Sequence, residues 1–138
     1  MKLTLLLQIA GLLHLGLLCA GLMMPRAVHL HEHLAKLPPF IRRLFLVYYS
    51  FIAMLLVGFG LITFFCAEAL ASGSPLARAM CGLLIVFWSM RLVAAAFVFD
   101  VRPYLTSWIL RAGYQATNLV FLYLLGVYVL VFMRGGPL

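Results

Sequence analysis

Hydrophobic residues are arranged along this chain in four long runs, and the short segments between them hold most of the charged residues. The runs cover residues 3–24, 40–70, 75–99 and 107–133. Each has the roughly 20 apolar residues that a helix needs to cross the hydrocarbon core of a bilayer. The pattern predicts an all-α integral membrane protein, a bundle of four transmembrane helices forming a single domain over residues 1–138.

Prolines and small polar residues indicate where these helices begin and end. Pro25 is expected to end the first helix, because proline lacks the amide hydrogen that an inner helical turn requires. Ser74 is expected to cap the third helix and Pro75 to be its first residue, a combination typical of helix starts. Thr106 or Ser107 is expected to cap the fourth helix.

The composition changes the picture in one respect, since it excludes a water-soluble domain. Hydrophobic residues make up 67% of the chain and charged residues 9%, which is too little polar surface to cover such a core in water. Four spans leave no room for a soluble catalytic module, and no Ser-His-Asp set, HExxH motif or phosphate loop occurs. We therefore expect a protein that is not an enzyme.

The net charge of +7 is interpreted as a signal for membrane orientation and for anionic lipid headgroups, not for nucleic acid. Six cationic residues lie in the first and third loops: Arg26, Lys36, Arg42, Arg43, Arg102 and Arg111. Three lie on the opposite side: Lys2, Arg78 and Arg134. The excess of positive charge in the two loops predicts that both termini lie outside the cytoplasm. Lys2 would also suit a signal peptide, but no Ala-x-Ala cleavage site follows, so a retained span is favoured.

The segment 26–37 between the first two spans has apolar and basic residues at helical spacing, which predicts a short amphipathic helix in the headgroup region. His29 and His33 stand four residues apart, the spacing at which two imidazoles of one helix can share a metal ion. The favoured interpretation is a solvated basic face attracted to anionic lipid, because His31 points about half a turn away from the other two histidines.

Arg91 is the most unusual polar residue in the apolar runs, because an arginine at the centre of a membrane helix costs about 2.5 to 3.5 kcal/mol unless it is paired or hydrated. Its level in the bundle predicts four candidate neighbours: Tyr48, Tyr49, Ser50 and Asn118. Three interpretations stay open: the side chain extends toward the nearer membrane surface, bonds within the bundle, or meets an anion or a partner subunit.

His14 lies in the first run between Gly11 and Gly16, where small neighbours would let a planar cofactor or another helix approach. Axial ligation of haem or of a chlorophyll-type pigment is one interpretation. A bis-histidine haem would need a second intramembrane histidine, and the sequence has none. A hydrogen bond between helices is the commoner role of such a residue.

These observations favour a non-enzymatic accessory or scaffold subunit that packs against a larger complex in a bacterial inner membrane, with a membrane protein or a second copy as its partner. A haem- or pigment-binding subunit using His14 is the alternative, and a small transporter or channel with Arg91 and Asn118 lining an anion path is a weaker one. In size and number of spans the chain resembles small bacterial membrane proteins such as the DoxX-like class, and this resemblance covers the architecture only.

Overall fold

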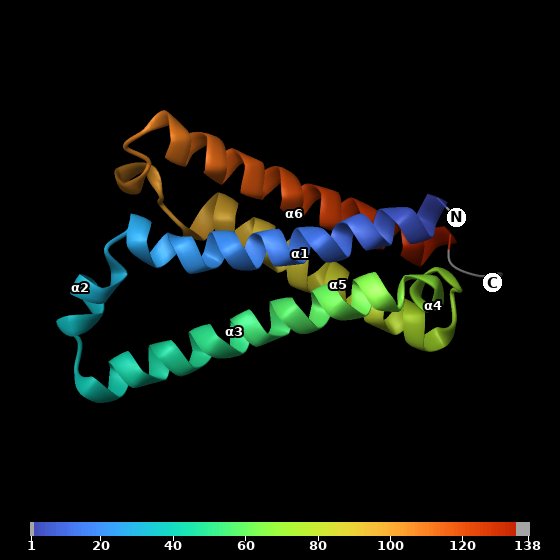
Figure 1. The fold of residues 1–138 in the computed structure, drawn as a ribbon, viewed down its shortest axis with the longest axis horizontal. Helices are drawn as coiled ribbons and strands as arrows, with labels where there is room; N and C mark the ends of the chain where they lie inside the picture. The colour runs from blue at the N-terminus through green and yellow to red at the C-terminus, as the bar shows by residue number, and fades with distance from the viewer. Residues whose placement is uncertain (1, 135–138) are drawn as a thin grey trace.

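The computed structural model describes residues 2–134, and within that range the regular structure is entirely helical. Four helices are long and apolar enough to cross a membrane: α1 (Lys2–Ala27), α3 (Pro39–Phe65), α5 (Pro75–Val93) with its continuation, and α6 (Trp108–Arg134). Successive long helices run in opposite directions, so α1 begins and α6 ends at the same end of the molecule (Figure 1). The predicted all-helical architecture with four long apolar helices is confirmed.

Four short elements connect the long helices. They are α2 (Leu30–Ala35), α4 (Ala67–Ala71), a π-helical turn η1 (Ala94–Val98) that continues α5, and a 3-10 turn η2 (Arg102–Tyr104). The short helix α2 lies at the end of the molecule opposite the start of α1 and the end of α6, and α4 lies at the same end as these two (Figure 1). The most extensive helix contacts are those of α1 with α3 and of α5 with α6, and α1 also packs against α6.

The α1–α3 contact is close because two glycines face each other across it. A Cβ atom added to Gly11 would lie 2.7 Å from the Cβ of Phe64 and 2.9 Å from the Gly60 carbonyl oxygen. A Cβ atom added to Gly60 would lie 3.0 Å from the Cβ of His14. The absence of side chains at these two positions therefore sets how near the helices can come, as small residues do in membrane helix pairs.

The prediction that Pro25 ends the first helix is wrong, because α1 continues through it to Ala27. Proline has no amide hydrogen to offer the carbonyl of Gly21, four residues earlier in the helix. That carbonyl instead accepts a hydrogen bond from the hydroxyl of Tyr49 on α3. A neighbouring helix thus satisfies the freed backbone group, which is how proline is tolerated inside membrane helices.

Other predicted helix boundaries are partly confirmed. Ser74 caps α5, where its Oγ accepts from the amide of Ala77 at 3.2 Å, and Ser107 caps α6 in the same way. The single helix expected over 40–70 is wrong: the chain leaves helical geometry at Cys66, and α4 then folds so that Ala67 and Leu70 are buried. This bend lets the end of the run contribute apolar side chains to the core.

The glycine contact makes a specific prediction about stability. Gly11→Ala should lower the free energy of unfolding by about 1 to 3 kcal/mol, because the new methyl group forces α1 and α3 apart. Gly16→Ala is the matched control, since a Cβ atom there meets nothing within 4 Å and alanine is the better helix former. Denaturant unfolding in detergent micelles measures both variants. Equal stability of the two would contradict the contact.

Candidate functional site

The core of the bundle contains a cluster of four polar or aromatic side chains, one from each long helix: His14, Thr63, Trp88 and Tyr128. All four are 0 to 1% exposed. The oxygen atoms of Thr63 and Tyr128 are 2.7 Å apart and share a hydrogen bond. The rings of Trp88 and Tyr128 form T-shaped pairs with the ring of His14, at centroid distances of 5.3 Å and 6.2 Å. We call these four residues the core cluster.

The imidazole of His14 is oriented by its own helix. Nδ1 lies 2.8 Å from the carbonyl oxygen of Ala10, and because a carbonyl only accepts, Nδ1 must donate the proton. This leaves Nε2 with its lone pair in the neutral ring. Nε2 has no hydrogen-bond partner, and neither does the buried Nε1–H donor of Trp88. The core cluster therefore holds one unused acceptor and one unused donor.

The surroundings of His14 do not fit a haem or a chlorophyll-type pigment. The space that Gly11 was expected to offer to a planar cofactor is occupied by α3, at Gly60 and Phe64. A recess of about 170 Å³ beside this glycine contact is lined by residues of α1 and α3 and does not include His14. Since the imidazole is 0% exposed, no macrocycle can reach Nε2 in this packing.

Arg91 lies on α5 about one helical turn beyond Trp88, toward η1, and is half-buried between two aromatic rings. Its Cζ atom is 5.2 Å from the ring centroid of Phe121 and 5.3 Å from that of Phe99. Within residues 2–134 the guanidinium has no hydrogen-bond acceptor and no carboxylate within 4.0 Å. Asn118, a predicted neighbour, keeps a buried Oδ1 without a partner.

The predicted polar neighbours of Arg91 on α3 are engaged elsewhere. The Tyr49 hydroxyl donates to the Gly21 carbonyl, and the Ser50 hydroxyl donates to the Leu46 carbonyl of its own helix at 2.9 Å. Tyr48 is 59% exposed on the outer surface. The structure therefore does not gather these three side chains around Arg91. Equal depth in the bundle did not imply a shared face.

The histidines of the first connection are not placed as the sequence predicts. The expected amphipathic helix over 26–37 is shortened to α2, and His29 precedes it in a left-handed conformation with φ 51°. His29 and His33 are thus not four residues apart in one helix. The nearest charged partner of His29 is Glu32, with Nδ1 3.8 Å from Oε1. The part of the chain that the structure describes contains no group of three or more potential ligands placed to hold a metal ion.

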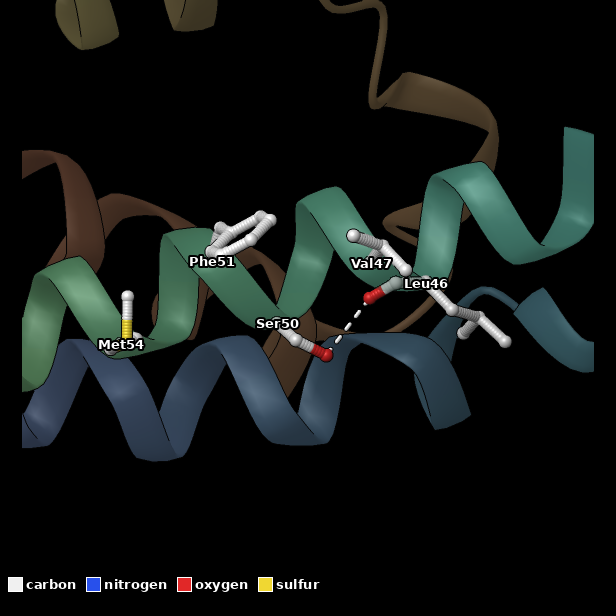
Figure 2. Close-up of a pocket in the computed structure, with 5 residues that line it drawn as sticks. All are labelled: Leu46, Val47, Ser50, Phe51 and Met54. Atoms are coloured by element: carbon white, nitrogen blue, oxygen red, sulfur yellow. Dashed lines mark hydrogen bonds between the residues drawn. The ribbon is translucent and has the colours of Figure 1, made fainter.

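The first half of α3 has a different character, because it presents apolar side chains on nearly all sides. From Phe40 to Leu55 no residue is buried. A shallow recess of about 340 Å³ lies on this half, and Figure 2 shows that its lining comes from α3 alone. The lining residues are Leu46, Val47, Ser50, Phe51 and Met54.

Sequence reasoning did not identify the core cluster as a unit. His14 was singled out, but Thr63, Trp88 and Tyr128 were not, although each carries a polar atom in an apolar run. The sequence signal for them was a polar atom in a span that is otherwise poor in hydrogen-bonding groups, because such residues usually face the interior of a helix bundle. Comparison of the chain with protein-family models, with curated proteins and with solved structures gives no match.

The hydrogen bond in the core cluster can be tested by removing one hydroxyl. Tyr128→Phe should lower the free energy of unfolding by about 0.6 to 2 kcal/mol, because Thr63 loses its partner between helices. Tyr48→Phe removes an exposed hydroxyl and should change stability little. Thermal unfolding in a fixed detergent compares the two variants, and an equal loss in both would show that the buried bond contributes nothing.

Proposed function

We propose that this protein is a non-enzymatic accessory subunit, embedded in a bilayer through its four long helices, which binds a larger membrane protein along the first half of α3. The observation that carries the proposal is the exposure of this half-helix. Phe40, Phe51 and Met54 are 71%, 52% and 61% exposed, whereas α1 and α5 each have buried residues in both halves. The start of α6 also lacks buried residues, but only from Trp108 to Val120, a shorter stretch than the unburied part of α3.

The way in which α3 is attached supports a docking role. Its second half is anchored in the core by Phe59, Gly60 and Thr63. In Figure 1 its first half diverges from α1 toward α2. The Tyr49 hydroxyl on this half donates a hydrogen bond to the Gly21 carbonyl of α1. The outer face is therefore held in a fixed direction without being covered by the chain itself.

The chemistry of the recess suits a second helix better than lipid tails alone. Ser50 is a small residue, and its hydroxyl is turned onto the Leu46 carbonyl of its own helix. Such residues let another helix approach closely, and Met54 beside it can adapt its shape to a partner. The packing gives no support to a transport path, because the core cluster is sealed and both recesses described above lie on outer faces.

We further propose that the membrane is a bacterial inner membrane and that both chain termini lie outside the cytoplasm. The ends of the bundle differ in positive charge, with six Lys or Arg residues near α2, η2 and the start of α6 and three near the termini. Exposed Tyr104 and Trp108 flank the more positive end, where aromatic side chains commonly mark a membrane interface.

The docking proposal predicts site-specific crosslinking. A photoreactive phenylalanine analogue at Val47 or Met54 should give one discrete adduct with a larger membrane protein, and the same analogue at Leu119 on α6 should give none. Ser50→Leu should abolish the adduct without unfolding the chain, because it fills the recess at an exposed position. A stable isolated monomer that gives equal, diffuse crosslinking at all positions would contradict the proposal. An adduct of twice the chain mass would show that the partner is a second copy of this chain and not a larger protein.

The orientation predicts cysteine accessibility. In a variant with Cys19 and Cys66 replaced by serine, Ser72→Cys should react with a membrane-impermeant maleimide on intact cells, because α4 and its turn are placed outside. Lys36→Cys should react only after the membrane is permeabilised. The opposite labelling pattern would reverse the assigned topology.

A further inference from the structure

We propose that Arg91 binds the phosphate of an anionic phospholipid where α5 and α6 approach the membrane surface at the η1 end. This inference goes beyond the partner proposed for α3 and does not depend on it. Arg91 lies seven residues before the end of η1, which corresponds to about 10 Å along a helix. The guanidinium lies between the ring of Phe99, which follows that end, and the ring of Phe121 on α6.

The first step of the argument is that the guanidinium lacks a hydrogen-bond acceptor. Phe99 and Phe121 contribute cation–π attraction, which compensates part of the charge. Ring faces do not replace the directed acceptors that the five N–H groups of a guanidinium require. No acidic side chain of residues 2–134 lies within 4.0 Å of it. The missing group is an anion with several oxygen atoms.

The second step concerns the backbone, which is the usual internal source of acceptors. In the π-helical turn the Phe99 amide bonds to the Ala94 carbonyl at 3.0 Å, so the Ala95 carbonyl is left without its ordinary helical partner. The hydroxyl of Tyr114 on α6 donates to that carbonyl at 3.2 Å. The carbonyl released by the turn is therefore already occupied. Within residues 2–134 Arg91 makes no hydrogen bond to this carbonyl or to another acceptor, and a phosphate would supply one.

The third step places a second polar group at the same level. Two contacts join α5 and its continuation η1 to α6. Trp88 stacks on Phe121 with centroids 5.3 Å apart, and nearer the η1 end the Tyr114 hydroxyl donates to the Ala95 carbonyl. Asn118 lies on α6 between these two contacts, as Arg91 does on α5. Its buried Oδ1 has no partner. This oxygen is an acceptor, so only the Nδ2–H donors of Asn118 could bond to a phosphate. Two unused polar side chains thus share one level of the α5–α6 pair.

The fourth step distinguishes a lipid from a free anion. The rim of this region is strongly apolar, with Phe97, Val98 and Trp108 exposed by 84%, 70% and 77%. Acyl chains would cover such side chains, whereas inorganic phosphate would not. Arg111 lies toward the headgroup level, where its Nε donates to the Leu105 carbonyl at 3.2 Å, and its remaining donors add positive charge. A phosphate carried by a lipid satisfies both the charge and the apolar rim.

Native mass spectrometry of the full chain, titrated with phosphatidylglycerol or phosphatidylcholine in detergent, tests the proposal. The unmodified chain should retain one phosphatidylglycerol more tightly than phosphatidylcholine. Arg91→Gln should weaken that preference about tenfold, because a charge-assisted hydrogen bond to phosphate is lost. Arg43→Gln is the matched control, since this exposed arginine in the first turn of α3 is remote from η1, and it should leave the retained lipid unchanged.

A second variant keeps the proposal testable if Arg91→Gln unfolds. Phe99→Leu keeps the charge of Arg91 and changes a half-exposed residue outside the helices. It should weaken the retention of phosphatidylglycerol several-fold, because the ring that contacts the guanidinium is lost. Undiminished phosphatidylglycerol binding by a folded Arg91→Gln variant would overturn the inference. So would full displacement of the lipid by inorganic phosphate, which would indicate a free-anion site. Loss of the α3 crosslink in Arg91→Gln, with lipid binding unchanged, would instead assign Arg91 to a partner carboxylate.

Discussion

Hydrogen-bond partners are scarce inside an apolar bundle, and tyrosine hydroxyls supply most of those that join its helices. In hydrocarbon an unpaired backbone or side-chain polar group costs several kcal/mol, so hydrogen bonds between helices are strongly favoured. Four tyrosines do this between elements: Tyr49 to Gly21, Tyr114 to Ala95, Tyr123 to Leu6, and Tyr128 with Thr63. Each bond contributes modestly, at about 0.6 to 2 kcal/mol, but together they link all four long helices.

The same constraint explains where the helices can be irregular. Pro25 frees the carbonyl of Gly21, and the turn η1 frees that of Ala95; in both places a tyrosine from a neighbouring helix takes the carbonyl. At these two positions the irregular backbone is compensated by a hydrogen bond from another helix. The bond from Tyr49 also affects the shape of the bundle. It links α3 to α1 on one side of α3 and leaves the outer side of α3 uncovered.

Local patterns predicted the parts of the fold that local physics controls. The four long helices followed from run length, and the caps at Ser74 and Ser107 followed from residue type. Pro25 was misjudged because its compensating hydroxyl lies on another helix, beyond any local window. His14 and Arg91 were recognised, but sequence gives the depth of a residue and not the rotation of its helix. Rotation decided that His14 faces the core and that Arg91 faces two rings.

The contacts of Arg91 within the described chain compensate its charge but leave its N–H groups without hydrogen-bond acceptors. An arginine inside a membrane helix costs about 2.5 to 3.5 kcal/mol, and cation–π contacts return about 0.5 to 2 kcal/mol each depending on desolvation. The rings of Phe121 and Phe99 can offset much of the cost of the charge, but their π faces accept no directed hydrogen bonds. Arg78 at the other end of the bundle lies over a single ring, that of Phe132, near the start of its helix where water is close. Arg91 lies farther from a helix end than Arg78, and a lipid phosphate is the acceptor that we propose for it.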